Sequence, residues 1–179
     1  LREDYYKKVM ENADLIESVI DYDKDYTFDY FALTTLIRAY LLKFDNKTIE
    51  RPQDLWMRVT LTVTGNEFNL DKIKETYKSL STGMYTHATP TLFNSGLKMQ
   101  QLSSCFLIGM EDDSIEGIFN TIKDCALISK TAGGIGMHAH NIRGSGSRIK
   151  STNGKSNGLI PFLKIFNETA KSVDQGGGK

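Results

Sequence analysis

A change in hydrophobic pattern near residue 82 constrains the fold of this chain most strongly. Before it, apolar residues recur at helical spacing. After it, short apolar runs alternate with Gly, Ser, Thr and Asn, which is typical of strands separated by loops and a helix. We therefore predict an α/β protein with a helical N-terminal region, residues 1–81, followed by a mixed region, residues 82–179.

Three segments of the first region have a clear helical pattern. The first covers residues 2–20. The second begins at Pro52, which suits a first helical turn, although the β-branched run 59–64 is also compatible with a strand. The third covers residues 71–80. The residues expected to face the core are Tyr6, Val9, Met10, Ala13 and Ile16 in the first segment, Leu55, Trp56, Val59 and Val63 in the second, and Ile73, Tyr77 and Leu80 in the third.

The most regular element of the second region is a helix that begins at Asp113. Asp113 can cap this helix, and Glu116 follows three residues later, where a capping box places an acid. Cys125 falls on its apolar face. The elements expected around the helix are a buried strand over 102–108, a second strand over 135–142 and a loop over 143–158 that is rich in Gly and Asn.

The overall charge excludes a general attraction to polyanions. Lys plus Arg and Asp plus Glu both number 22, so there is no net field to draw the protein onto nucleic acid or an anionic membrane. No apolar run approaches the roughly 20 residues of a membrane helix, and no signal peptide opens the chain. We therefore expect a cytoplasmic protein. Its two cysteines form neither a disulfide framework nor a complete zinc site.

Familiar nucleotide-binding motifs are absent. A P-loop ending at Gly154-Lys155-Ser156 would need glycine at position 149, which is Ile149, and the glycines at 133–136 lack the dinucleotide-binding frame. These glycines could simply form turns, but glycine also lets a backbone approach a phosphate closely. His138 and His140 are two ligands without a third, so we assign them no metal.

A series of short motifs carries the strongest functional signal. Its segments are 88–94 (ATPTLFN), 102–107 (LSSCFL), 112–117 (DDSIEG), 132–136 (AGGIG), 152–158 (TNGKSNG) and 173–177 (VDQGG). In order and spacing this series resembles the large subunit of ribonucleotide reductase. The resemblance implies that the helical N-terminal region is followed by the first part of a ten-stranded α/β barrel.

The resemblance also implies a reaction in which ribonucleoside diphosphates become deoxyribonucleotides for DNA synthesis. In the family, a cysteine radical starts the reaction and a redox-active dithiol reduces the substrate. Cys105 matches one member of that dithiol. A thiol with this role must be reducible and must point into a pocket from a rigid element. Thr89, Ser104 and Gly134 match positions that bind the substrate.

A second group of residues matches the family's allosteric specificity site, which binds a deoxynucleoside triphosphate or ATP. A helix N-terminus favours phosphate, and basic side chains add charge and donors. The residues that match are Asp113, Ser114, Ile115, Lys130, Arg143, Lys150 and Ser151, with Asp174 and Gln175 at the start of a loop that leads to the active site.

Several parts of the family's machinery have no match in these residues, including the radical cysteine and the second cysteine of the dithiol. The chain also begins with Leu1 and ends in a glycine-rich run. We therefore expect a piece of a longer polypeptide that is inactive alone. The implied partners are a second large subunit, a small subunit whose metal supplies the radical, and thioredoxin or glutaredoxin; no cofactor, nucleic acid or membrane is expected to bind this chain. Two alternatives remain open: a cobalamin-dependent ribonucleotide reductase, and a non-catalytic nucleotide-binding or interaction module.

Overall fold

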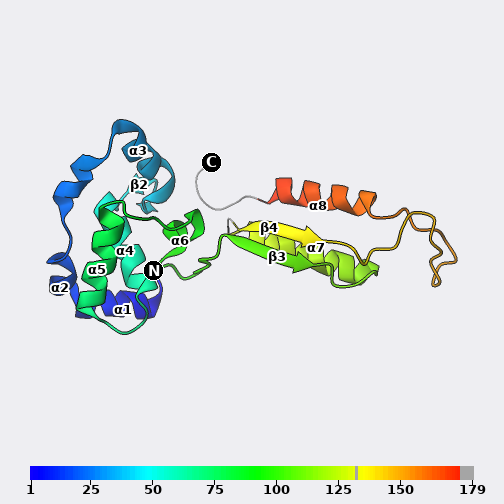
Figure 1. Ribbon diagram of the computed structural model, residues 1–179, viewed down its shortest axis with the longest axis horizontal. Helices are drawn as coiled ribbons and strands as arrows, with labels where there is room; N and C mark the ends of the chain where they lie inside the picture. Colours follow the sequence, from blue (N-terminus) through cyan, green and yellow to red (C-terminus); the bar gives the residue numbers. More distant parts are fainter. Residues whose placement is uncertain (132, 174–179) are drawn as a thin grey trace. The chain divides into compact units, whose positions relative to one another are not determined.

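The computed structural model describes residues 1–131 and 133–173, which form two compact units (Figure 1). The first unit is Leu1–Leu102, and the second begins at Ser103. The boundary drawn from the sequence after residue 81 falls inside the first unit. Each unit has its own hydrophobic core.

The first unit is predominantly helical, as the sequence predicts. Its one small sheet is an antiparallel pair in which Lys43 lies opposite Thr48. In chain order the elements are α1 (Glu3–Glu11), α2 (Ala13–Glu17), the 3₁₀ helix η1 (Tyr22–Thr27), α3 (Tyr30–Thr35), the π-helical turn η2 (Leu36–Tyr40), β1 (Lys43–Phe44), β2 (Lys47–Thr48), α4 (Pro52–Val63), α5 (Leu70–Ser81) and α6 (Thr89–Asn94).

The core of this unit is built on α4 and α5. The β-branched run 59–64, which was also compatible with a strand, forms the end of α4. Pro52 starts this helix, and Val59 is completely buried within it. The expected face of α5 is confirmed: Ile73, Tyr77 and Leu80 are all buried. Gly65 follows α4 with φ of 94°, a left-handed conformation that suits glycine.

The predicted face of the first helical segment is partly wrong. Ile16 is buried, but Tyr5 rather than Tyr6 faces the core, and Tyr6 and Met10 are more than half exposed. The segment also breaks into α1 and α2 at Asn12, whose side chain donates to the Lys8 carbonyl oxygen at 2.9 Å. A short polar side chain that binds nearby backbone competes with helix continuation, and the break changes which residues face inward.

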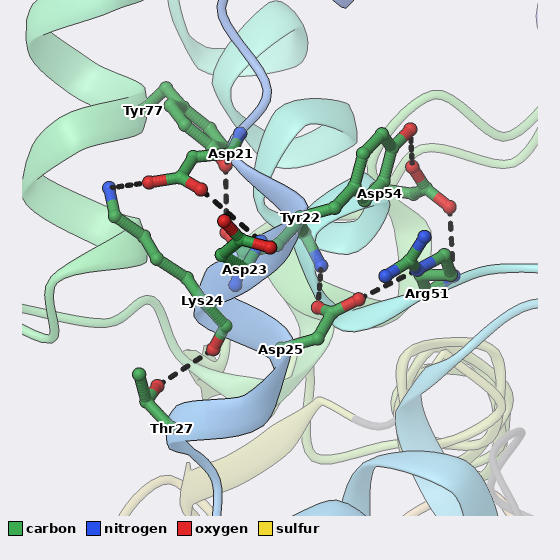
Figure 2. A network of polar contacts seen from close by, with 10 residues as sticks. Asp21, Tyr22, Asp23, Lys24, Asp25, Thr27, Arg51, Asp54 and Tyr77 are labelled. Carbon is green, nitrogen blue, oxygen red and sulfur yellow. Dashed lines mark hydrogen bonds and ion pairs between the residues drawn. The ribbon is translucent and has the colours of Figure 1, made fainter.

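Charged residues hold η1 against the start of α4 (Figure 2). Asp25 accepts from the Gln53 backbone N–H at 3.1 Å and from Arg51 Nε at 2.7 Å. Asp54 accepts from the Arg51 backbone N–H at 2.8 Å and from the Tyr22 hydroxyl at 2.9 Å. One carboxylate therefore binds a free N–H of the first turn of α4 and the other binds the N–H of its N-cap, where the helix dipole favours negative charge.

The second unit is a strand–helix–strand motif followed by a further helix (Figure 1). Strands β3 (Cys105–Gly109) and β4 (Gly134–His138) are parallel and in register, with Cys105 opposite Gly134. Between them in sequence lies α7 (Ile115–Ser129), and α8 (Ile160–Ser172) follows a long loop. The helices pack around a small core of Met110, Ile118 and Ile122. This parallel arrangement is consistent with the start of an α/β barrel.

Both strands are shorter than predicted, and the first is more exposed than the buried strand expected from the sequence. The first begins at Cys105 rather than 102, and the second ends at His138 rather than 142. Along β3 the side chains alternate, so that Phe106 and Ile108 are half-buried while Cys105 and Leu107 are exposed, Leu107 to 94%. Only one face of the ribbon is packed, and the thiol lies on the other face.

Candidate active site and effector site

Cys105 lies at the first position of β3 and is exposed. The Ser104 hydroxyl donates to Cys105 Sγ at 3.6 Å. Across the ribbon, the Gly134 backbone N–H donates to the Ser104 carbonyl oxygen at 2.7 Å. The structure therefore brings together three of the residues that the sequence assigned to the substrate site. The thiol is therefore carried by a hydrogen-bonded strand, and a rigid element of this kind can fix the direction of a reactive side chain.

The surface beside the thiol is open because Gly134 has no side chain. A Cβ atom added there would approach only the Ser104 carbonyl oxygen, at 3.4 Å. The next two glycines on this face each have a side chain close by: an added Cβ would lie 3.0 Å from Leu107 Cδ2 at Gly136 and 2.8 Å from His138 Nε2 at Gly109. The uncovered part of this face therefore lies next to Cys105, where another molecule can approach the backbone.

Thr89, the fourth residue of the predicted substrate site, belongs to the first unit. It is the first residue of α6, and its hydroxyl lies 3.3 Å from the Tyr40 hydroxyl. The same short helix is fixed to the end of its unit by Thr91, which donates to the Leu102 carbonyl oxygen at 2.9 Å. Thr89 thus belongs to a different unit from Ser104 and Gly134.

The predicted cap of α7 is wrong by one residue. Ser114, not Asp113, is the N-cap, and its hydroxyl accepts from the Gly117 backbone N–H at 3.0 Å. The third helical position is therefore Gly117, and Glu116 cannot complete a capping box. Asp113 instead accepts from Arg143 Nε at 2.6 Å, and its backbone oxygen accepts from Arg143 Nη2 at 2.9 Å.

This pairing joins two residues that the sequence placed in the effector site but did not predict to touch. They are 30 positions apart in the sequence. The fold brings Arg143, which follows β4, back to the start of α7. Ile115, at the first position of α7, is 66% exposed. Asp113, Ser114, Ile115 and Arg143 therefore gather around one end of this helix.

The remaining predicted effector residues lie elsewhere. Lys130 follows the last residue of α7, so the helix, 15 residues long and about 22 Å by its rise per residue, separates it from Ser114. Lys150 and Ser151 are exposed at the turn of a hairpin-like loop whose arms join at Gly146 and Ser156. Asp174 and Gln175 lie outside the described residues.

Cys125 differs from Cys105 in its surroundings. It is half-buried on α7, and burial, with the nearby Asp124 carboxylate second, raises the pKa of its thiol. His138 and His140 place their Nδ1 atoms 2.8 Å apart, a distance at which one imidazole donates to the other. Among the described residues, no group of three or more His, Cys, Asp or Glu side chains is arranged to hold a metal ion.

Both units match parts of the same enzyme. Residues 26–100 match the family model described as the all-alpha domain of ribonucleotide reductase, and residues 103–179 match the one described as its barrel domain. These two matches define a class of protein in which an all-helical domain precedes a barrel domain. They meet close to the boundary between the two structural units.

Curated relatives agree over the whole chain. It is 52% identical over 179 residues to the "Ribonucleoside-diphosphate reductase large chain 2" of Saccharomyces cerevisiae, covering 100% of this chain and 20% of that protein. It is 56% identical over 174 residues to the large chain of Cryptosporidium parvum, covering 97% and 21% respectively, and 51% identical over 179 residues to the large subunit of Arabidopsis thaliana, covering 100% and 22%.

The chain therefore belongs to the ribonucleotide reductase large-subunit family, and it spans about a fifth of the length of these relatives. In the part of the chain that the structure describes, no helix is long and apolar enough to cross a membrane.

Proposed function

We propose that the protein containing this chain is a ribonucleoside-diphosphate reductase, and that Cys105 is one of the thiols that reduces its substrate. The observation that supports this role best is the exposed thiol on β3 beside the uncovered backbone of Gly134. Ser104 is adjacent and offers a hydroxyl, and Thr89 of the first unit is a further residue proposed to bind substrate through its hydroxyl. Small hydroxyls of this kind suit hydrogen bonds to the phosphate and ribose oxygens of a nucleotide.

The proposed chemistry is balanced by a second thiol from a part of the protein outside this chain. Two thiols give up two electrons and two hydrogens, the substrate loses its 2′ oxygen as water, and the thiols end as a disulfide. A further dithiol, that of thioredoxin or glutaredoxin, then restores both thiols by exchange. The radical that starts each turnover comes from a metal-containing small subunit, and this chain holds no cofactor. The protein acts in the cytoplasm.

We also propose that the residues around the start of α7 bind a deoxynucleoside triphosphate or ATP as an allosteric effector. Arg143 supplies a planar cation, and the helix N-terminus supplies a favourable dipole. Lys130 lies at the other end of α7, so within one copy it is too far away to join them. A homodimer with antiparallel α7 helices would bring Lys130 of one copy to this site of the other, and the exposed Ile115, Phe119 and Leu127 provide an apolar surface for such pairing.

Replacement of Cys105 by Ser tests the catalytic role in the complete enzyme. Serine preserves the size of the side chain but cannot form a disulfide, so turnover with a dithiol protein reductant should stop while substrate still binds with nearly unchanged affinity. Cys125→Ser is the matched control because it removes the other thiol from the packed helix, and it should retain turnover. Continued multiple turnover by Cys105→Ser would contradict the assignment.

A further inference from the structure

The contact between Asp113 and Arg143 occupies the groups that an effector would use. Arg143 donates through two of its nitrogens, one to the Asp113 carboxylate and one to the Asp113 backbone oxygen, at 2.6 and 2.9 Å. The Arg143 side chain is 35% exposed and the Asp113 side chain 26%, so the pair lies at the surface of the unit but is not fully solvated. A guanidinium held this way presents only part of its donor fork to an incoming phosphate.

We propose that this ion pair is a latch that closes the effector site until a triphosphate displaces it. The inference rests on the effector role proposed above and adds a mode of regulation to it. A triphosphate carries several negative charges, so it competes with a single carboxylate for Arg143. Opening the latch frees the Asp113 carboxylate at the same time, and this carboxylate can then accept from a ribose hydroxyl.

The surroundings of Arg143 favour a swing of the side chain rather than a shift of the backbone. Ile142 packs against the core of the second unit, and the Asn141 side chain donates to the Met110 carbonyl oxygen at 3.1 Å. On the other side, the loop closes on itself where the Gly146 N–H donates to the Ser156 carbonyl oxygen at 2.8 Å. The backbone is thus held on both sides of Arg143, while a third of its side chain is exposed and has a route to move.

The latch should weaken triphosphate binding by a modest factor. Partly exposed ion pairs contribute little net stability, so opening one costs roughly a two- to fivefold loss of affinity. A triphosphate repays that cost with contacts of its own, whereas a ligand with a single weak charge does not. The effector site would then discriminate for highly charged ligands before any base is recognised.

Inorganic tripolyphosphate tests the latch because it has the charge of the effector and no ribose. With the protein that contains this chain, we expect Asp113→Asn to bind tripolyphosphate roughly two- to fivefold more tightly than wild type in calorimetric titrations at low salt. Deoxynucleoside triphosphates should gain less from the same change, because the carboxylate that would accept from their ribose is lost. Asp113→Ser, with a different small polar side chain before the helix, should give the same pattern.

Asp112→Asn is the matched control, since it removes the same charge one residue earlier and no ion pair to Arg143 is found for Asp112 in the described structure. Equal gains in Asp112→Asn and Asp113→Asn would reduce the effect to general electrostatics and refute the latch. Weaker tripolyphosphate binding by Asp113→Asn would also refute it, because Asp113 would then be orienting Arg143 for the ligand. If no variant, wild type included, binds tripolyphosphate or a deoxynucleoside triphosphate, the effector-site proposal itself fails.

Discussion

At the scale of single residues, the two cysteines of this chain differ in their surroundings. Both thiols are free among the described residues, but Cys105 is exposed on a strand and Cys125 is half-buried on a helix. The sequence anticipated the packed position of Cys125, which recurs with the apolar residues of a helical pattern, but it placed Cys105 on a buried strand, whereas the structure leaves this thiol exposed. The Asp113–Arg143 contact was not foreseeable in the same way. Asp113 and Arg143 are 30 positions apart, and no local sequence pattern such as helical spacing links them.

The raised pKa of Cys125 leads to a prediction on thiol reactivity. The thiolate is the reactive form, and burial beside Asp124 keeps the pKa of this thiol above its ordinary value of 9.0. At pH 7.5 iodoacetamide should therefore modify Cys105 well before Cys125, and Cys125 should become reactive only as the pH rises above 9. Peptide mass spectrometry after timed labelling measures both rates. Faster labelling of Cys125 than of Cys105 at pH 7.5 would show that burial does not control the reactivity of this thiol.

At the scale of elements, the presence of the helices was predicted more accurately than the residues at which they begin and end. The stripes of α4 and α5 were recognisable because Pro52 marks a start and the apolar spacing is regular. The start of α7 was misplaced because Asp113 and Ser114 are both good N-caps and are adjacent in sequence. Arg143, from a distant part of the chain, engages Asp113 and leaves the cap to Ser114. Tertiary contacts therefore settled a choice that local propensity left open.

Gly117 supplies a prediction in which packing opposes helix propensity. It lies in the first turn of α7, where Gly→Ala alone should stabilise a helix by about 1 kcal/mol. A Cβ atom there would lie 2.7 Å from the Asp112 backbone nitrogen and 2.9 Å from its oxygen, so the chain that enters the helix would have to move. We expect Gly117→Ala to lower the free energy of unfolding by roughly 1–3 kcal/mol in urea titrations.

Gly134→Ala is the control for this substitution, because its added methyl group meets nothing closer than the Ser104 carbonyl oxygen at 3.4 Å. It should leave the free energy of unfolding nearly unchanged while filling the open surface beside Cys105. A stabilising Gly117→Ala would mean that the entry to α7 relaxes easily and that propensity dominates at this position.

At the scale of the whole molecule, the sequence indicated the order of a helical region and a mixed region, while the position of the division depends on packing. Residues 82–102 have the Gly- and Thr-rich texture of the second region, yet α6 lies among them and Leu92 packs into the first core. Composition reflects local flexibility, whereas a unit is defined by which side chains are buried together. The first strand was predicted as buried for a related reason. Leu107 was expected to be covered as part of that strand, but among the described residues it is 94% exposed.

The two units should differ in their ability to fold independently. The first buries a connected core that includes Leu55, Val59 and Ile73, each fully enclosed. In the second, the core among described residues is Met110, Ile118 and Ile122, while large apolar side chains such as Leu107 and Ile115 are mostly exposed. Burial of apolar surface is the main term that opposes chain entropy, and small cores supply little of it.

We therefore expect residues 1–102, produced alone, to unfold in a single cooperative thermal transition followed by far-ultraviolet circular dichroism. Residues 103–179 alone should show weak helicity, no cooperative transition and binding of a dye that reports exposed apolar surface. A cooperative transition in isolated 103–179 would show that its small core is sufficient, and that the exposed apolar residues of β3 and α7 are not a sign of missing partners.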